Sequence, residues 1–240
     1  MGMKKTILHK ADTRGFADHG WLKSHHTFSF ANYHNPERTH FGVLRVLNDD
    51  QVAPDQGFGT HPHNNMEIIS IPLEGDLEHK DSMGNVTVIR EGDVQVMSAG
   101  TGVYHSEYNK NDDRAVKFLQ IWVFPREKNV EPRYDQISIQ HIAEEDKFYQ
   151  ILSPNKDDQG VWIHQDAWFS LGSFASGKTD SYQLHQEGNG VYLFVLEGSV
   201  EVMGQILDTR DGFAIREIKD FELTAKSDAR VLLMEIPLTI

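Results

Sequence analysis

Short runs of residues that alternate between apolar and polar, or that are rich in β-branched side chains, recur along the whole chain. Alternation of this kind is typical of a β-strand, because successive side chains of a strand point to opposite faces. Turns rich in glycine, asparagine and aspartate separate the runs, at a spacing that suits antiparallel sandwiches or barrels. The runs occupy residues 41–49, 66–75, 85–98, 115–124, 190–203 and 229–238. We therefore expect an all-β protein, in which the best helical candidate is the short stretch His141 to Leu152.

The two halves of the sequence echo each other. Residues 71–79, IPLEGDLEH, resemble residues 194–202, FVLEGSVEV, and REGDVQVM at 90–97 resembles RDGFAIRE at 210–217. The segments begin 123 residues apart in the first pair and 120 in the second. Two matches at nearly one offset predict a duplicated β-unit.

A polar stretch with a proline near each end, residues 125–136, is the best candidate for a linker between the two halves. The length of 240 residues suits one large domain or two small ones. With the duplication, this predicts two tandem β-domains, residues 1–130 and residues 131–240.

Composition excludes several classes of partner. The chain has 23 Lys and Arg against 36 Asp and Glu, a net charge of −13, and no basic run longer than two residues. Nucleic acids and anionic membranes need a basic surface, so we expect neither as a direct partner. We also find no apolar run long enough to span a membrane and expect a cytoplasmic protein, with Met1-Gly2-Met3 a cloning remnant rather than a myristoylation signal.

The chain contains no cysteine, so any metal must be held by His, Asp or Glu. Two triplets offer such ligands: His61-Pro62-His63, and His105-Ser106-Glu107. In an extended chain residues i and i+2 share a face, so each triplet directs two metal-competent side chains into one space.

Together the triplets would give a site of three histidines and one glutamate, a donor set that suits first-row transition metals. Chance is the alternative, because 13 histidines in 240 residues predict about 0.7 His-x-His pairs. Ordinary surface histidines therefore stay open as an interpretation. The metal site is favoured because each triplet follows a glycine-rich turn and adjoins a predicted strand.

The spacing of these residues resembles the two motifs of the cupin pattern, which here are His61, His63, Glu67 and Gly75, then Gly92, Gly102, His105 and Asn109. The blocks RGFADHGWLKSHHTFSFANY (14–33), GTHPHNNMEI, MSAGTGVYHSEYN and LQIWV closely resemble the pirin family of bicupins over essentially the whole chain. The resemblance implies two tandem cupin (jelly-roll β-barrel) domains. Both triplets lie in the first half, whereas His164 and His185 in the second have no His-x-His partner and no histidine follows Gly212. We therefore expect the metal in the first domain and a packing role, without a metal, for the second.

The resemblance also bears on the carboxylate ligand. A standard cupin would use Glu67, whereas pirins use the glutamate two residues after the third histidine, which is Glu107 here. The implied metal ligands are thus His61, His63, His105 and Glu107. Glu67 could then accept a hydrogen bond from a ligand imidazole or be an ordinary strand carboxylate. The metal would be one divalent transition ion, with Fe(II) the first choice and Ni, Co, Mn, Cu and Zn as alternatives.

Bacterial pirin-like bicupins resemble quercetin 2,3-dioxygenases, which open the flavonol ring with O₂. The resemblance implies a flavonol-like aromatic substrate whose 3-hydroxyl binds the metal as its anion, with Glu107 the candidate catalytic group that accepts the proton. The aromatic residues Phe30, Phe58, Tyr104 and Trp122 are candidate pocket walls. His25 and His26 could also line the pocket, although the alternation of Phe28 and Phe30 favours a core strand there.

A second hypothesis treats the chain as a metal-dependent regulatory module, as its resemblance to animal pirins implies. The acidic charge means that such a role would run through a protein partner. A third is a lyase or isomerase on the same site, since fold and ligands do not fix the substrate. We expect a monomer, because an internal duplication can supply the contact that a single cupin finds by dimerising.

Overall fold

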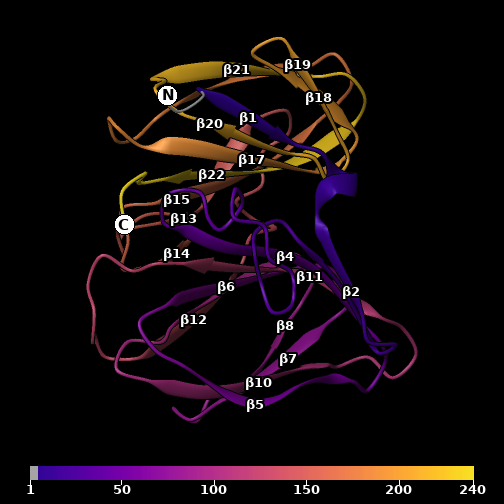
Figure 1. Ribbon diagram of the computed structural model, residues 1–240, viewed down its shortest axis with the longest axis vertical. Coiled ribbons are helices and arrows are strands. Elements are labelled where there is room, and N and C mark those ends of the chain that lie inside the picture. Colours follow the sequence, from indigo (N-terminus) through magenta and orange to yellow (C-terminus); the bar gives the residue numbers. More distant parts are fainter. Residues whose placement is uncertain (1–4) are drawn as a thin grey trace.

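The computed structural model describes residues 5–240 and consists almost wholly of strands (Figure 1). The first half contains β1 (Thr6–His9), β2 (Gly15–Asp18), β3 (Leu22–His26), β4 (Leu44–Val52), β5 (Gly57–His63), β6 (Glu67–Glu74), β7 (Leu77–Asp81), β8 (Val86–Ile89), β9 (Asp93–Ser98), β10 (Val103–Asn109) and β11 (Val116–Val123). The second contains β12 (Arg133–Ser138), β13 (Phe148–Ser153), β14 (Val161–Trp162), β15 (Trp168–Phe174), β16 (Thr179–Gln183), β17 (Gly190–Glu197), β18 (Ser199–Val202), β19 (Gln205–Asp208), β20 (Gly212–Ile215), β21 (Asp220–Ala225) and β22 (Ala229–Ile236). One 3-10 turn, Ala11–Thr13, follows β1.

These strands form two sandwiches, each made of a seven-stranded and a four-stranded sheet. The first sandwich has the orders β12-β9-β6-β11-β4-β3-β2 and β5-β10-β7-β8. The second has β1-β20-β17-β22-β15-β13-β14 and β16-β21-β18-β19. The orders correspond strand by strand, so the echo between the halves of the sequence reflects the same fold built twice. This confirms the expected all-β architecture of two tandem cupin domains.

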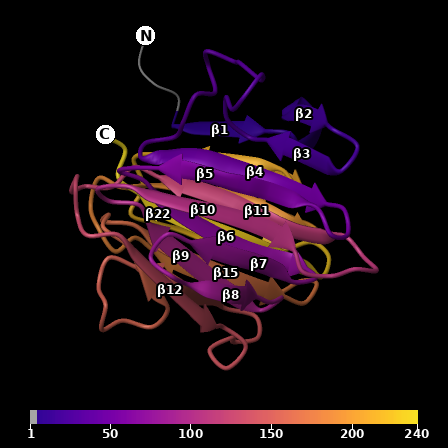
Figure 2. The ribbon, with the colours of Figure 1, turned by 90° about the horizontal axis from the view of Figure 1, so that it is seen from below.

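The seven-stranded sheets of the two sandwiches pack against each other at the centre of the molecule, and the four-stranded sheets lie on the outside (Figure 1). The central core joins Leu47 and Ile69 of one sheet to Phe169 and Phe194 of the other, and Phe28 from the loop after β3 packs with them. Figure 2 shows the small sheet of the first sandwich lying across its large sheet. Both faces of each large sheet are therefore covered, which explains why strands such as β6 and β17 are buried along almost their whole length.

The two sandwiches differ in how their interiors are filled. The second has a single apolar cluster that includes Phe174, Leu193 and Leu223. The first has two smaller clusters, one around Phe118 and the other around Ile68. Because Ile68 pairs with Trp122 near the far end of β11, these clusters lie at opposite ends of that strand. Polar side chains occupy the space between the two clusters.

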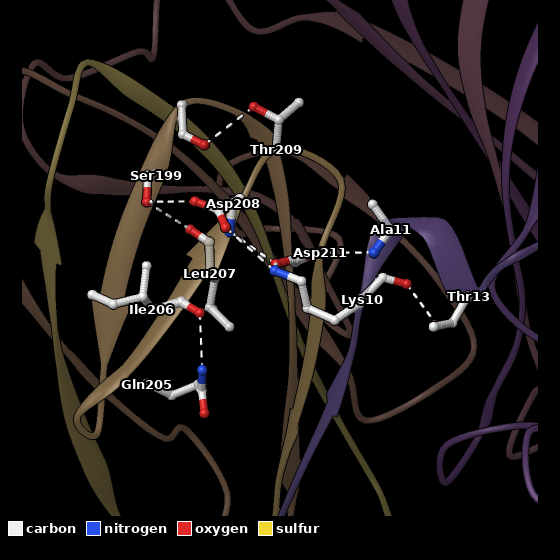
Figure 3. Close-up of polar contacts among 11 residues, drawn as sticks. Lys10, Ala11, Thr13, Ser199, Gln205, Ile206, Leu207, Asp208, Thr209 and Asp211 are labelled. Atoms are coloured by element: carbon white, nitrogen blue, oxygen red, sulfur yellow. Dashed lines mark hydrogen bonds and ion pairs between the residues drawn. The ribbon is translucent and has the colours of Figure 1, made fainter.

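Two edge strands tie the halves of the chain together. Strand β1 pairs with β20 at the edge of the second sandwich, and β12 pairs with β9 of the first. Figure 3 shows how the end of β1 is fixed: the Asp211 carboxylate accepts hydrogen bonds from Lys10 Nζ and from the Ala11 backbone N–H. The domain boundary at residues 130 and 131 stays a prediction. The expected linker is a loop only up to residue 132, since Arg133–Ser138 is a strand.

The prediction of a helix over His141 to Leu152 is wrong. Residues 140–142 form a turn, Asp146 has a φ of +58°, and Phe148–Ser153 is strand β13. Pairing with β15 lets β13 bury Ile151 and Leu152 in the central core, a tertiary gain that a short isolated helix cannot match.

No helix among residues 5–240 is long and apolar enough to cross a bilayer. The interpretation of Met1-Gly2-Met3 falls outside the described residues.

Candidate metal centre

The three predicted histidines meet between two neighbouring strands of the small sheet. Strands β5 and β10 run antiparallel with His105 directly opposite His61, and His63 lies two residues further along β5. The ring centroids are 4.4 Å apart for His61 and His105, 4.9 Å for His63 and His105, and 4.9 Å for His61 and His63. One ligand nitrogen from each ring lies within 4.8 Å of the other two. This is the convergence that a single cation requires.

The polar atoms of these rings fit a cation. His61 Nδ1 lies 2.8 Å from the Gly59 carbonyl, so Nδ1–H donates there and Nε2 is left with a free lone pair. Both ring nitrogens of His105 are buried with no hydrogen-bond partner among the described residues. Unpartnered buried nitrogens are costly, and a bound cation would satisfy one of them.

Two of these imidazoles are held in the neutral form. Burial, together with the neighbouring imidazoles, lowers the pKa of His63 to about 4 and that of His105 to about 3. A neutral imidazole carries the lone pair that a metal ligand needs. His63 and His105 can therefore accept a divalent cation at neutral pH without first losing a proton.

Glu107 lies beside this cluster, and each of its carboxylate oxygens accepts one hydrogen bond. Its carboxylate accepts hydrogen bonds from Ser70 Oγ at 3.1 Å and from Gln120 Nε2 at 2.7 Å. It belongs to a second group of close metal-competent atoms, formed with His105 and His79. The two groups share His105, and the register of β10 against β5 shifts between His105 and Glu107. The structure thus brings the three histidines together and puts Glu107 next to one of them.

His79, on β7, is a residue that the sequence reasoning missed. Its Nε2 lies 2.9 Å from Asp81 Oδ2, both side chains are fully buried, and its Nδ1 has no partner among the described residues. Its ring centroid is 5.4 Å from that of His105. The signal was present in His79-Lys80-Asp81, which repeats the i, i+2 spacing of the other two triplets.

A cavity of about 360 Å³ opens beside the cluster and is lined by both His61 and Glu107. The candidate wall residues Phe30, Phe58 and Trp122 line it, as does His26. Trp122 sets its ring edge-on to His63, with centroids 4.9 Å apart. His25 does not line the cavity; it packs on Phe16 with centroids 4.7 Å apart.

The cavity also contains a buried carboxyl that the sequence reasoning missed, Asp50 on β4. Its Oδ1 accepts a hydrogen bond from Ser24 Oγ on β3. Burial raises the pKa of Asp50 to about 7, despite that hydrogen bond. The run Asn48-Asp49-Asp50-Gln51 inside an apolar strand was the available signal, since a buried strand rarely carries so many polar residues.

Two expected site residues lie elsewhere. Tyr104 is 58% exposed, because it alternates with His105 along β10 and so points out of the sandwich. Glu67 does not face the histidines; its Oε2 accepts a hydrogen bond from Ser98 Oγ at 2.7 Å. The shared parity of Glu67 with His63 is lost because a turn through Asn65, with φ +47°, carries the chain from the small sheet to the large one.

A cluster of metal-competent histidines at a cavity in the first of two tandem cupin sandwiches defines a bicupin with a candidate metal centre. Comparison with known proteins agrees. The Pirin family model matches residues 8–123, and the model of the quercetinase C-terminal cupin domain matches residues 150–236. The chain is 42% identical over 230 residues to a quercetin 2,3-dioxygenase of Escherichia coli (strain K12), covering 96% of this chain and 98% of the relative. The protein therefore belongs to the pirin family.

Two further relatives extend the comparison. A pirin-like protein of Caulobacter vibrioides is 39% identical over 225 residues, covering 93% of this chain and 96% of the relative. A crystal structure of a bacterial pirin from Escherichia coli in complex with nickel(II) superposes with a TM-score of 0.91 at 40% identity, covering 97% of this chain and 99% of that one.

Proposed function

We propose that this protein binds one divalent transition metal through His61, His63, His105 and Glu107 and uses it to cleave flavonol-like aromatic substrates with O₂, as a quercetin 2,3-dioxygenase. The observation that carries the proposal is the convergence of three histidines, one of which, His61, lines a cavity that also has aromatic side chains in its wall. The names of the relatives support the reaction type, and the nickel(II) complex of one relative supports a metal. Fe(II) stays our first choice, with Ni, Co, Mn, Cu and Zn open to the same donor set.

A metal ion bound here would supply Lewis-acid charge that stabilises the deprotonated 3-hydroxyl of the substrate. The protein's own residues handle the proton. Glu107 lines the cavity and accepts the 3-hydroxyl proton on a carboxylate oxygen. Gln120 and Ser70 hold that carboxylate in one orientation through their hydrogen bonds.

Aromatic side chains in the cavity wall provide the other requirement, a surface on which the substrate rings can pack. Phe30 packs edge-on against Trp122, with ring centroids 5.5 Å apart, and Phe58 packs against Trp21 at the same separation. These rings can hold a planar aromatic substrate and exclude water from the reacting atoms.

The test is quercetin-dependent oxygen uptake by protein reconstituted separately with Fe(II), Mn, Co, Ni and Cu. A His61→Ala/His63→Ala variant serves as the control, because flavonols autoxidise. We expect uptake with at least one metal and its loss in the double variant. No uptake with any metal, despite one bound ion that the variant loses, would contradict the enzyme and favour a metal-binding module that acts on a protein partner. A Glu107→Gln variant that retained both metal and full turnover would remove Glu107 as the proton acceptor.

A further inference from the structure

A row of polar side chains crosses the cavity face of the large sheet, between the two apolar clusters of the first sandwich. Gln120 of β11 pairs with Ser70 of β6 on one side and with Asn48 of β4 on the other, and Asn48 pairs with His26 of β3. The row thus runs from Ser70 and Gln120, which hold Glu107, to His26. Strands lie about 4.8 Å apart, so His26 is roughly 10 Å across the sheet from Gln120.

At the end of this row that includes His26 and Asn48, two buried polar atoms lack a hydrogen-bond partner among the described residues. His26 is 4% exposed and Asn48 is 2% exposed, yet His26 Nδ1 and Asn48 Oδ1 are buried with no hydrogen-bond partner among the residues that the structure describes. Both residues line the cavity, and so do Asp50 and Ser24 from the same two strands. Buried polar groups are normally paired, so a cluster left unpaired in a cavity wall indicates a ligand that pairs with it.

We propose that His26, Asn48 and Asp50 form a subsite that recognises a hydroxyl group on the aromatic substrate, one to two strands across the sheet from Gln120, which holds Glu107. The inference rests on the proposed function and specifies its substrate class. A polyhydroxylated compound of at least two joined rings has the length to reach both ends of the row. An organic acid fits poorly, because Asp50 and Glu107 both present carboxyl groups to the cavity.

A hydroxyl group matches these partners in either protonation state of Asp50. Burial raises the pKa of that carboxyl to about 7, so near neutral pH it both donates and accepts. Ser24 already donates to one carboxyl oxygen, which fixes the orientation of the other. A hydroxyl donates to a carboxylate or amide oxygen and accepts from a carboxylic acid or an imidazole N–H.

The test compares two ligands that share the 3-hydroxyl and differ at the rest of the ring system. Quercetin carries further hydroxyls, whereas 3-hydroxyflavone carries the 3-hydroxyl alone. Their dissociation constants are measured without O₂ on the nickel(II)-loaded protein and on its Asn48→Leu and Asp50→Asn variants. Asp50→Asn preserves the size of the side chain and an oxygen for Ser24, so it guards against a folding defect in Asn48→Leu. Metal content and thermal unfolding are recorded for each protein.

We expect both variants to bind quercetin roughly tenfold more weakly and 3-hydroxyflavone as the wild type does. Suppose that the wild type binds both ligands. If the variants then bind quercetin as tightly as the wild type does, or if their affinity for both ligands falls equally, the subsite is overturned and the proposed function still stands. A metal-loaded wild type that binds neither ligand would instead contradict the proposed substrate class, and the subsite with it.

Discussion

Glu67 shows at the level of one residue how the central packing controls stability. The carboxyl lies where the two sandwiches meet, close to Arg133 and His164, and burial raises its pKa from 4.5 to about 7. The folded protein therefore holds this proton more tightly than the unfolded chain does. The stability from this group is fully present below about pH 4.5 and is lost as pH rises through about 7.

We predict that Glu67→Gln stabilises the protein at alkaline pH. The amide is neutral at every pH, so its advantage over the wild type grows from pH 5 to pH 8.5 and reaches at most about 3 kcal/mol. Thermal unfolding across this range measures it, with Glu197→Gln as the control because Glu197 is exposed. A difference in melting temperature that did not change with pH would contradict the assignment.

Individual residues also show where sequence reasoning succeeds and where it stops. The shared face of His61 and His63 could be predicted, because i and i+2 positions lie on one face of a strand. The pairing of β5 with β10, which puts His105 opposite His61, does not follow from that rule. The same rule failed for Glu67, since a turn stands between it and His63 and moves it to the other sheet. Whether Asp50 faces a cavity depends on which strands pair across the sandwich, and one sequence does not contain that information.

Among the elements, the pairing of β5 with β10 brings the candidate ligands together. This pairing needs a glycine at position 57, because a Cβ there would lie 2.3 Å from the Glu107 carbonyl oxygen and 2.5 Å from Tyr108 Cα. Gly59, two residues away in the same strand, would meet nothing within 4 Å. One strand therefore contains both a sensitive position and its matched control.

We predict that Gly57→Ala pushes β5 away from β10, lowers the free energy of unfolding by about 2 kcal/mol and weakens nickel(II) binding. Gly59→Ala should leave both quantities near the wild-type values. Urea unfolding and calorimetric titration with nickel(II) measure the two effects. Equal behaviour of the two variants would show that the close approach at Gly57 does not govern the site.

Strand elements were the most predictable part of the fold, and their ends the least. The run at 190–203 is interrupted at Gly198, where φ is +75° and a Cβ would lie 2.0 Å from the Asp228 carbonyl oxygen. The stretch His141 to Leu152 is the best helical candidate in the sequence, yet its last five residues, Phe148 to Leu152, belong to β13, which pairs with β15. The alternation of apolar and polar residues along the sequence indicates where a strand lies. The strand beside it in the sheet determines the residues at which the pairing begins and ends.

Across the whole molecule, duplication followed by divergence explains why the two sandwiches share a fold but differ in their interiors. The two sandwiches share one strand order, but only the second has a single apolar cluster between its sheets. In the first, polar side chains separate two apolar clusters and make room for the candidate metal centre. Because the large sheets already cover each other, we expect a monomer in solution, which sedimentation or light scattering would check.

The first strand of the chain should stabilise the second sandwich. Asp211 is 1% exposed and accepts hydrogen bonds from Lys10, from the Ala11 N–H and from the Asp208 N–H. We predict that Asp211→Ala leaves the Ala11 and Asp208 N–H groups without this partner, costs about 2 kcal/mol and speeds hydrogen exchange of the backbone amides in β1 and β20. Asp208→Ala is the control, because its side chain is 63% exposed. Unchanged exchange in β1 would count against this role for Asp211.

The central claim is that His61, His63 and His105 hold one divalent metal ion together with Glu107. The most direct measurement is the anomalous scattering of nickel(II)-loaded crystals at the nickel edge. The account predicts one strong peak contacted by the three imidazoles and by the Glu107 carboxylate. A peak held by His79, His105 and Glu107 without His61 and His63, or no peak between β5 and β10, would contradict it.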